Sequence, residues 1–278
     1  MFKKLCLFTL VATILLGACM PIGTFELASG LPVGGAKRTL TVFAAASLTE
    51  AFNELAARFE AENRDVDVLL NFAGSQQLAQ QIVEGAPVDV FASANHKQME
   101  IAARSSRIAT NSVHIFANNR LVVIFPKDNP AGLSSLADLA KPGLKLGLAA
   151  QAVPVGQYSL EFLESASTDA NFGPEYKGEV LANVVTYEQT VKAVLSKVVL
   201  GEVDAGIVYV SDTWGPASSK LGRLAIPDAL NPLASYTITT LNDSSQEDLA
   251  NSFVAFVLSP QGQEILAKNG LMPVLTYR

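Results

Sequence analysis

The sequence predicts an α/β protein of two lobes, each a mostly parallel sheet flanked by helices, with a hinge between the lobes. Short apolar segments typical of strands buried on both faces alternate with segments whose apolar residues recur at helical spacing. This alternation indicates parallel sheets covered by helices. Polar interruptions near residues 118–120 and 231–232 divide the strands into two groups. Hydrophobic residues make up 49% of the 278 residues and charged residues only 17%, which excludes a long disordered or coiled-coil protein.

The first residues have the layout of a secretory signal. Lys3 and Lys4 precede an apolar run over residues 5–16. The run is too short to span a bilayer comfortably, and the order of charge and then hydrophobic residues is typical of exported proteins. We therefore predict a signal peptide over residues 1–18 and a protein that works outside the cytoplasm.

A lipid anchor is predicted directly after this signal. Residues 16–19 (LGAC) are similar to the bacterial lipobox, in which the cysteine is lipidated and becomes the first residue of the mature protein. We therefore predict lipidation of Cys19 and a flexible linker rich in Gly and Pro over residues 19–38. The alternative is an ordinary signal peptide with a chance cysteine near its cleavage site.

The remaining residues, 39–278, form the predicted body, which begins with a strand-to-helix unit. Residues 40–46 are an apolar run typical of a buried strand. A helix follows from Ser47, with Glu50 placed to complete a capping box and with apolar residues at spacings of three and four. Further strands are predicted at residues 66–72, 88–92, 121–125, 146–149, 205–209 and 235–241, and further helices at residues 78–83, 136–140, 157–166, 188–200, 246–258 and 260–268.

The two polar interruptions set the predicted lobe boundaries. Lobe 1 comprises residues 39–117 and 232–278, and lobe 2 comprises residues 118–231. Because the chain crosses between the lobes twice, a cleft between them can open and close by a hinge.

Composition excludes several classes of function. The formal net charge is −6, so nucleic acid and anionic membrane surfaces are poor partners. Both cysteines, Cys6 and Cys19, precede the body, which excludes disulfides, zinc clusters and cysteine catalysis there. His96 and His114 are the only histidines, and neither has a carboxylate or cysteine at ligand spacing, so no metal site is predicted.

Several helices begin directly after strands at small or hydroxyl residues. Ser47, Ser75 and residues 154–156 occupy such positions. In parallel sheets these ends gather at one edge, where backbone N–H groups and the positive end of the helix dipole can hold an anion. The alternative is that Ser47 and Ser75 simply cap their own helices. Taken one at a time, these residues favour the capping interpretation.

Five segments then occur in order along the body. They are residues 43–48 (FAAASL), 72–75 (FAGS), 85–91 (GAPVDVF), 153–156 (VPVG) and 206–212 (GIVYVSD). In this order, after a lipobox-like leader, they resemble the molybdate-binding proteins of bacterial ABC importers over nearly the whole body. The resemblance implies a two-lobed periplasmic binding protein of type II.

The resemblance also implies the function and the site. It implies a monomer that captures molybdate, and also tungstate, without a cofactor or catalysis, and that delivers the anion to a membrane permease. Hydroxyl and backbone N–H donors would come from lobe 1, and backbone amides and a phenolic O–H would come from lobe 2. The residues carried over are Ser47 and Ser75 in lobe 1 and Val155, Val191 and Tyr209 in lobe 2.

Some of these transfers have alternatives. The position of Val191 rests on a looser pattern, so Thr190 and Lys192 replace it if the register slips by one residue. Without the resemblance, Tyr209 is a residue at the end of a buried strand whose hydroxyl reaches solvent.

Two other functions remain as alternatives. The first is the same fold with another ligand, such as sulfate, phosphate or a chelated ferric ion. The second is an exported hydrolase with Ser47 as nucleophile. The hydrolase is disfavoured because no Gly-x-Ser-x-Gly elbow surrounds Ser47 and no evident base is present to activate it.

Overall fold

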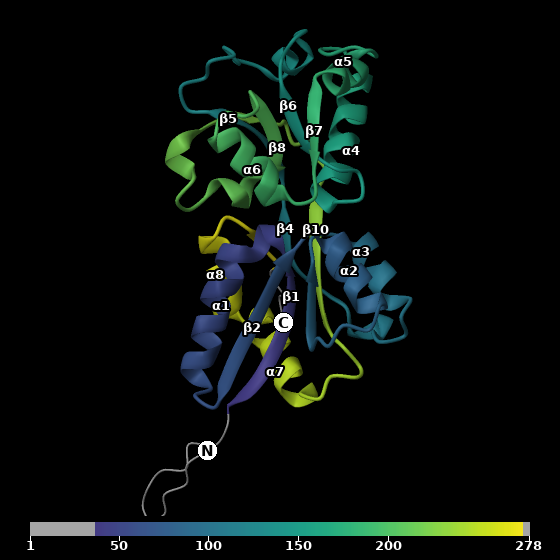
Figure 1. Cartoon of the computed structure of the whole chain (residues 1–278), viewed down its shortest axis with the longest axis vertical. Helices are drawn as coiled ribbons and strands as arrows, with labels where there is room; N and C mark the ends of the chain where they lie inside the picture. Colours follow the sequence, from purple (N-terminus) through teal and green to yellow (C-terminus); the bar gives the residue numbers. More distant parts are fainter. Residues whose placement is uncertain (1–36, 275–278) are drawn as a thin grey trace, which may run out of the picture. The chain divides into compact units, whose positions relative to one another are not determined.

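The computed structural model describes residues 37–274, and the chain in this range forms two sheets, each with its own helices (Figure 1). Sheet A has the strand order β11-β4-β10-β3-β1-β2, and sheet B has the order β7-β6-β8-β5-β9. The strands of sheet A are β1 (Arg38–Ala45), β2 (Val66–Ala73), β3 (Val90–Ser93), β4 (His114–Asn119), β10 (Ala234–Thr240) and β11 (Met272–Pro273). Those of sheet B are β5 (Leu121–Pro126), β6 (Leu146–Ala149), β7 (Val184–Glu188), β8 (Ala205–Tyr209) and β9 (Leu221–Ala225).

Helices cover both sheets. In lobe 1, which contains sheet A, they are α1 (Thr49–Glu62), α2 (Ser75–Val83), α3 (His96–Ala103), α7 (Glu247–Leu258) and α8 (Pro260–Lys268). In lobe 2, which contains sheet B, they are α4 (Pro154–Thr168), α5 (Tyr176–Ala182) and α6 (Val191–Val199). Short 3-10 turns include η1 (Ala46–Leu48), η3 (Leu136–Ala140) and η4 (Val210–Thr213). Figure 1 shows α1 and α2 on opposite sides of β1.

The centre of sheet A is buried on both faces, as the apolar run predicts. Leu40 and Val42 of β1 pack with α1 and α7 in the larger hydrophobic cluster. Phe43, whose side chain points to the other face of the sheet, packs with α2 and α3 in a second hydrophobic cluster. Since neighbouring residues of a strand face opposite sides, both kinds of side chain must be apolar. On the α1 side, Phe59 packs edge-on against Phe253 of α7, with ring centroids 5.2 Å apart.

The predicted fold of two lobes, each a sheet flanked by helices, is confirmed, but each sheet is mixed and not mostly parallel. In sheet A, β1 pairs in parallel with β2 and β3, but β10 is antiparallel to both β3 and β4. In sheet B, β6 is parallel to β7 and β8, while β5 is antiparallel to β8 and β9. The antiparallel strands include those that carry the chain between the lobes. An apolar run shows burial and not direction, so the sequence does not reveal this reversal.

The chain passes between the two sheets twice. β4 continues into β5 through Arg120, and the segment after β9 returns the chain to β10. The Asn231 side chain joins the two crossings, since its Nδ2 donates to Leu121 O at 2.8 Å and its Oδ1 accepts from Leu121 N at 2.9 Å. The Arg120 guanidinium also donates to the Asn231 carbonyl oxygen. These bonds satisfy buried backbone groups at the crossing.

The predicted signal peptide over residues 1–18, Cys19 and most of the predicted linker lie outside the described residues. β1 begins at Arg38, next to the predicted start of the body. Across residues 37–274, none of the helices has the length and apolar character needed to cross a membrane.

Candidate functional site

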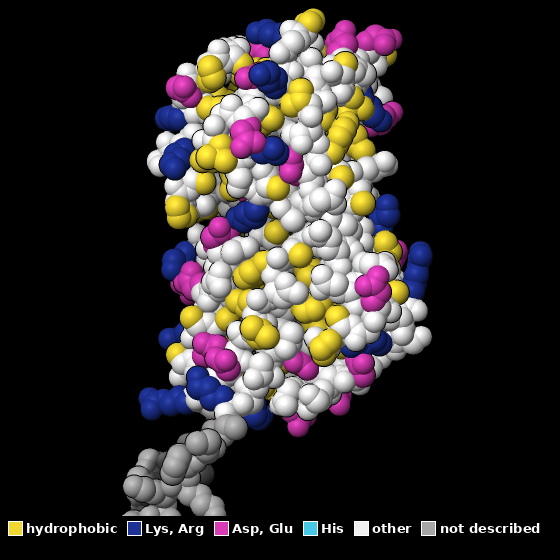
Figure 2. All heavy atoms as spheres, in the orientation of Figure 1, with side chains coloured by type: hydrophobic (Ala, Val, Ile, Leu, Met, Phe, Trp, Pro, Cys, Tyr) yellow, Lys and Arg dark blue, Asp and Glu magenta, His cyan; other side chains and the backbone are white. Residues whose placement is uncertain are grey.

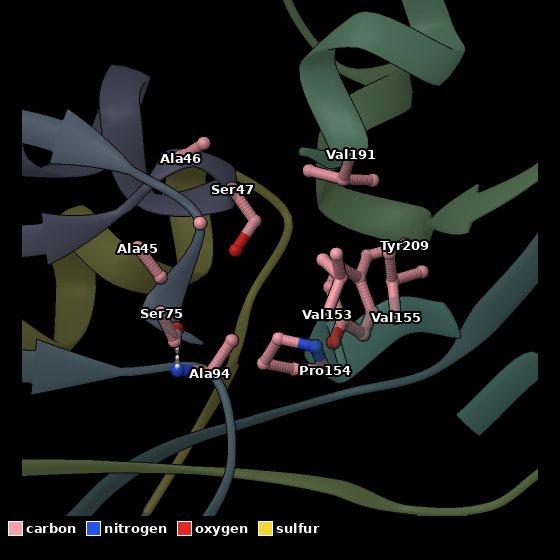
Figure 3. Close-up of a pocket in the computed structure, with 11 residues that line it drawn as sticks. Ala45, Ala46, Ser47, Ser75, Ala94, Val153, Pro154, Val155, Val191 and Tyr209 are labelled. Atoms are coloured by element: carbon pink, nitrogen blue, oxygen red, sulfur yellow. Dashed lines mark hydrogen bonds between the residues drawn. The ribbon is translucent and has the colours of Figure 1, made fainter. Parts of the chain in front are cut away.

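One pocket between the lobes brings together all five residues predicted as ligand donors (Figure 3). It has an empty volume of about 210 Å³, part of it open to solvent, and every residue that lines it is uncharged. The lining residues are Ala45, Ala46, Ser47, Gly74, Ser75 and Ala94 from lobe 1 and Val153, Pro154, Val155, Val191 and Tyr209 from lobe 2.

Strand register brings the two serines to the same edge of sheet A. β1 and β2 are parallel neighbours, and Ala45 at the end of β1 lies opposite Ala73 at the end of β2. Ser47 and Ser75 follow these two ends and therefore emerge at the same edge of sheet A. Both side chains are buried, with relative exposures of 5% and 1%.

The hydroxyl of Ser75 is oriented by a neighbouring strand end. Ala94 N donates to Ser75 Oγ at 3.0 Å, drawn as the dashed line in Figure 3. A backbone N–H can only donate, so Ser75 Oγ accepts there and its own hydrogen remains available to the pocket. Gly74, and not Ser75, is the N-cap of α2. The alternative that Ser75 caps its own helix is therefore wrong.

Ser47 does not cap a helix either. Its Oγ lies 2.9 Å from the Tyr236 hydroxyl oxygen, and the N-cap of α1 is Leu48, which makes no side-chain cap bond. The predicted capping box between Ser47 and Glu50 is wrong because the 3-10 turn η1 separates Ser47 from the start of α1. The carboxylate of Glu50 instead bonds Lys192 in lobe 2.

The lobe 2 wall consists of two helix starts. Val155 is the second residue of α4, after Pro154, and Val191 is the first residue of α6. The first N–H groups of a helix have no acceptor within it, and the described residues provide none for Val155 N or Val191 N. These amides can therefore donate to a bound anion, aided by the helix dipole.

Neither Thr190 nor Lys192, the two alternatives to Val191, lines the pocket. The Thr190 side chain accepts from Ala193 N at 3.1 Å and so caps α6. The Lys192 ammonium is held by carboxylates outside the pocket. Of these three consecutive residues, Val191 is the one that lines the pocket.

The start of α4 lies tight against the end of β6. A Cβ at Gly156 would collide with the carbonyl oxygens of Ala149 and Ala150. Glycine at this position therefore lets α4 begin where its first amides reach the pocket.

Tyr209 contributes a buried hydroxyl that lies close to the Tyr236 hydroxyl. The residue is 1% exposed, and no hydrogen bond to its hydroxyl occurs within the described part of the chain. Its ring packs edge-on against Tyr158 and Tyr236. Burial raises the pKa of Tyr209 well above its usual value, so the group stays a neutral O–H donor. The alternative that this hydroxyl reaches solvent is wrong.

An ion-pair network joins the lobes beside the pocket. Lys192 Nζ donates to both carboxylate oxygens of Glu50, at 2.7 and 2.9 Å, and lies 3.3 Å from Asp212 Oδ1. Burial raises the pKa of Asp212 to about 6, although Lys192 opposes the shift. Burial would lower the pKa of Lys192, but its two carboxylate partners outweigh that effect and raise it. The Lys192 charge is thus compensated.

Further contacts close the lobes around the site. Gln76 Nε2 donates to Gln189 O at 3.0 Å, and Gln98 Nε2 donates to Ala152 O at 3.0 Å. Gly74 lies so near the opposite lobe that a Cβ would be 2.6 Å from Gln189 O. The pocket is therefore enclosed by both lobes at once.

The other polar residues singled out in the sequence lie elsewhere. His96 Nε2 pairs with Glu100 at 3.4 Å on the surface, and His114 is exposed. Over residues 37–274, His, Cys, Asp and Glu side chains form no group of three or more that could hold a metal ion. Donors in the pocket are therefore neutral N–H and O–H groups, which can bind an anion.

Comparisons with known proteins show the family of this chain. Residues 40–272 match the family described as bacterial extracellular solute-binding protein. A molybdate-binding protein of Mycobacterium tuberculosis is 36% identical over 263 residues, which cover 94% of this chain and 95% of the relative.

Two solved structures share the fold. The periplasmic molybdate-binding protein of Azotobacter vinelandii has a TM-score of 0.72 at 20% identity and covers 86% of this chain and 100% of its own. The sulfate-binding protein of M. tuberculosis has a TM-score of 0.76 at 15% identity and covers 86% of this chain and 88% of its own. At such identities these structures establish the two-lobed fold alone. The family match and the 36% identical relative show that this chain belongs to the bacterial extracellular solute-binding proteins, a family that binds solutes and does not catalyse reactions.

Proposed function

We propose that this protein captures molybdate, and also tungstate, between its lobes and delivers the anion to the permease of an ABC importer. One observation carries the proposal, namely that donors from both lobes converge on a pocket without a charged lining residue. The 36% identical relative, named as a molybdate-binding protein, supports the choice of anion.

The proposed ligand shell consists of Ser47, Ser75, Val155, Val191 and Tyr209. Burying an oxyanion is costly unless fixed donors replace its hydration shell. Each hydrogen bond to a charged oxygen contributes about 1.5 to 3 kcal/mol, so a closed set of five to seven such bonds offsets the costs of association and closure. Positive side chains are then unnecessary.

The same chemistry sets a preference among anions. A fully ionised oxyanion only accepts hydrogen bonds, whereas hydrogen phosphate also carries an O–H that needs an acceptor. A pocket made only of donors therefore disfavours phosphate near neutral pH. Sulfate fits the same donor set and is the second candidate, which size alone would separate from molybdate.

We further propose that the lobes comprise residues 39–117 with 232–278 and residues 118–231, a division that falls within β4, and that they close around the anion about the two crossings. The closed surface formed by both lobes would then be what the permease recognises. The contacts of Lys192 with Glu50 and of Gln76 with Gln189 support this proposal because they join the lobes beside the pocket.

We propose that the protein acts as a monomer outside the cytoplasm, with a lipid anchor at Cys19. On the face shown in Figure 2, positive and negative side chains are interspersed, which gives nucleic acid no basic patch on that face.

Metabolic labelling with a fatty acid tests the anchor. The wild type should be labelled and membrane-bound, and a Cys19→Ala variant should be neither. Equal release of both forms into the medium would contradict the anchor.

A ligand panel tests the function itself. The purified body is titrated with molybdate, tungstate, sulfate and phosphate, and the thermal midpoint is followed at each concentration. A ligand that binds only the folded state raises the midpoint with the logarithm of its concentration over Kd. We expect large shifts with molybdate and tungstate and none with phosphate. A shift with sulfate alone would replace molybdate by the second candidate.

A further inference from the structure

Two buried polar side chains, Asn119 and Tyr236, lead by hydrogen bonds to Ser47, and we call this series the relay. Tyr236 of β10 and Asn119 of β4 are both 0% exposed, and they belong to the two neighbouring strands next to the crossings between lobes. Tyr236 Oη lies 2.9 Å from Ser47 Oγ, and Asn119 Nδ2 lies 3.4 Å from Tyr236 Oη. Neither Asn119 nor Tyr236 lines the pocket.

The orientation of the Asn119 amide sets the direction of the hydrogen bonds in this relay. Arg120 N donates to Asn119 Oδ1 at 3.0 Å, and because a backbone N–H can only donate, the atom facing it must be the oxygen. The Asn119 NH₂ group therefore faces the opposite way, and it donates to Ser211 Oγ at 2.8 Å and to Tyr236 Oη.

The hydrogen of the Tyr236 hydroxyl is best placed toward Ser47. Its oxygen accepts from Asn119, and the group has no access to solvent. Within residues 37–274, Ser47 Oγ is the remaining partner in hydrogen-bond geometry, at 2.9 Å, whereas the Tyr209 hydroxyl beside Tyr236 makes no such bond. Leaving a buried donor unpaired is costly, so Tyr236 donates and Ser47 accepts.

We propose that Asn119 and Tyr236 are positioning residues that fix Ser47 as a hydrogen donor toward the bound anion. With its oxygen already accepting from Tyr236, Ser47 turns its own hydrogen to the pocket, where Figure 3 shows its oxygen pointing. The relay thereby makes the lobe 1 wall reject an O–H group on the ligand. This inference rests on the proposed function and assigns its selectivity to residues outside the pocket.

Replacing Asn119 by aspartate should reverse the direction of every hydrogen bond in the relay. In an Asn119→Asp variant, the carboxylate replaces the donating NH₂ by an acceptor of the same shape. The Tyr236 hydroxyl then donates to that carboxylate and accepts from Ser47, so Ser47 presents lone pairs to the anion. We expect the Kd for molybdate to rise about 100-fold, and the preference for molybdate over hydrogen phosphate to fall with it.

Removing the Tyr236 hydroxyl should break the hydrogen bond to Ser47 without reversing its direction. A Tyr236→Phe variant leaves Ser47 free to rotate, so we expect a smaller rise in Kd, about 5- to 10-fold. In the Tyr236→Phe background, Asn119→Asp should have little further effect, and so should Tyr236→Phe in a Ser47→Ala background. Tyr176→Phe is the matched control, since the buried Tyr176 hydroxyl donates to Leu136 O away from the pocket.

The experiment is calorimetric titration of these variants with molybdate and phosphate, after thermal unfolding has shown that each is folded. Non-additive losses and a reduced molybdate preference in Asn119→Asp would support the relay. If Tyr236→Phe binds like Tyr176→Phe, or if the full Asn119→Asp loss persists in the Tyr236→Phe background, direct repulsion or general structure explains the data and the relay is overturned. If the wild type binds no oxyanion, the proposed function fails and the role of the relay fails with it.

Discussion

The two walls of the pocket supply the same kind of donor by different means. Lobe 1 offers the hydroxyls of Ser47 and Ser75, whose oxygens are already engaged by the protein. Lobe 2 offers the amides of Val155 and Val191, which any non-proline residue would carry, together with the Tyr209 hydroxyl. Changing a side chain can therefore disable the first wall, whereas the amides of the second can be removed only by changing the backbone.

The largest effect should come from removing both hydroxyls of the first wall. A Ser47→Ala, Ser75→Ala double variant loses two charge-assisted hydrogen bonds, so the Kd for molybdate should rise by about 10² to 10⁴, which corresponds to about 3 to 6 kcal/mol. Ser105→Ala, Ser112→Ala is a matched control because both hydroxyls donate to carbonyls away from the pocket. Calorimetry that gives the same affinity for both double variants would remove the serines from the ligand shell.

The second wall can be probed by proline. Val191 is the first residue of α6, and Thr190 before it has φ −146° and ψ 156°, which a following proline accepts. Val191→Pro therefore deletes one amide while preserving the helix, and we expect the Kd to rise about 10- to 150-fold. Val191→Ala keeps the N–H and should bind nearly as well as the wild type. Equal affinities of the two variants in a titration would show that this amide does not bind the anion.

Tyr209 should separate binding from stability. Its hydroxyl has no partner within the described residues, so Tyr209→Phe should weaken molybdate binding about 10-fold without destabilising the free protein. Ser75→Ala, by contrast, strips the acceptor from Ala94 N and should cost about 1 to 3 kcal/mol of stability in addition to affinity. Urea unfolding and calorimetry on both variants check the contrast, and an equal loss of stability would contradict it.

The ion pair of Lys192 and Asp212 beside the pocket should affect affinity least. Its effect should appear in the pH dependence of the unfolding free energy. The pKa of Asp212 is raised to about 6 from 3.8, so the folded state binds more protons than the unfolded state between these values. The contribution of Asp212 to stability is therefore complete below about pH 4 and is lost as the pH rises through about 6. Unfolding free energies of the wild type and Asp212→Asn, measured from pH 4 to 7, should show the difference between them falling across this window. A constant difference would contradict the assignment.

Much of this arrangement follows from local sequence. Residues 146–149 and 205–209 were predicted as strands with the bounds that the structure gives, because strands buried on both faces leave uninterrupted apolar runs. The edge strands β7 and β9 were missed, since half-exposed residues interrupt their apolar pattern. The strand-to-helix pattern pointed to Ser47, Ser75 and residues 154–156, whereas Val191 and Tyr209 came from the resemblance, as a valine at a helix start carries no chemical signal of its own.

Other features depend on contacts between distant residues and could not be predicted. Tyr236 and Ser47 are 189 positions apart, and Lys192 and Glu50 are 142 apart. Each residue alone has an ordinary local role, such as a strand aromatic or a helix-capping group. Only the fold brings these residues together, so the contact of Ser47 with Tyr236 and the ion pair between the lobes could be found only from the structure.

The central claim is that neutral donors from two lobes replace the hydration shell of an oxyanion. A crystal structure of the protein grown with molybdate tests it most directly. We predict the anion in the pocket between Ser47, Ser75, Val155, Val191 and Tyr209, with Lys192 still bonded to Glu50. An empty pocket, or an anion held chiefly by lysine or arginine side chains, would contradict the account.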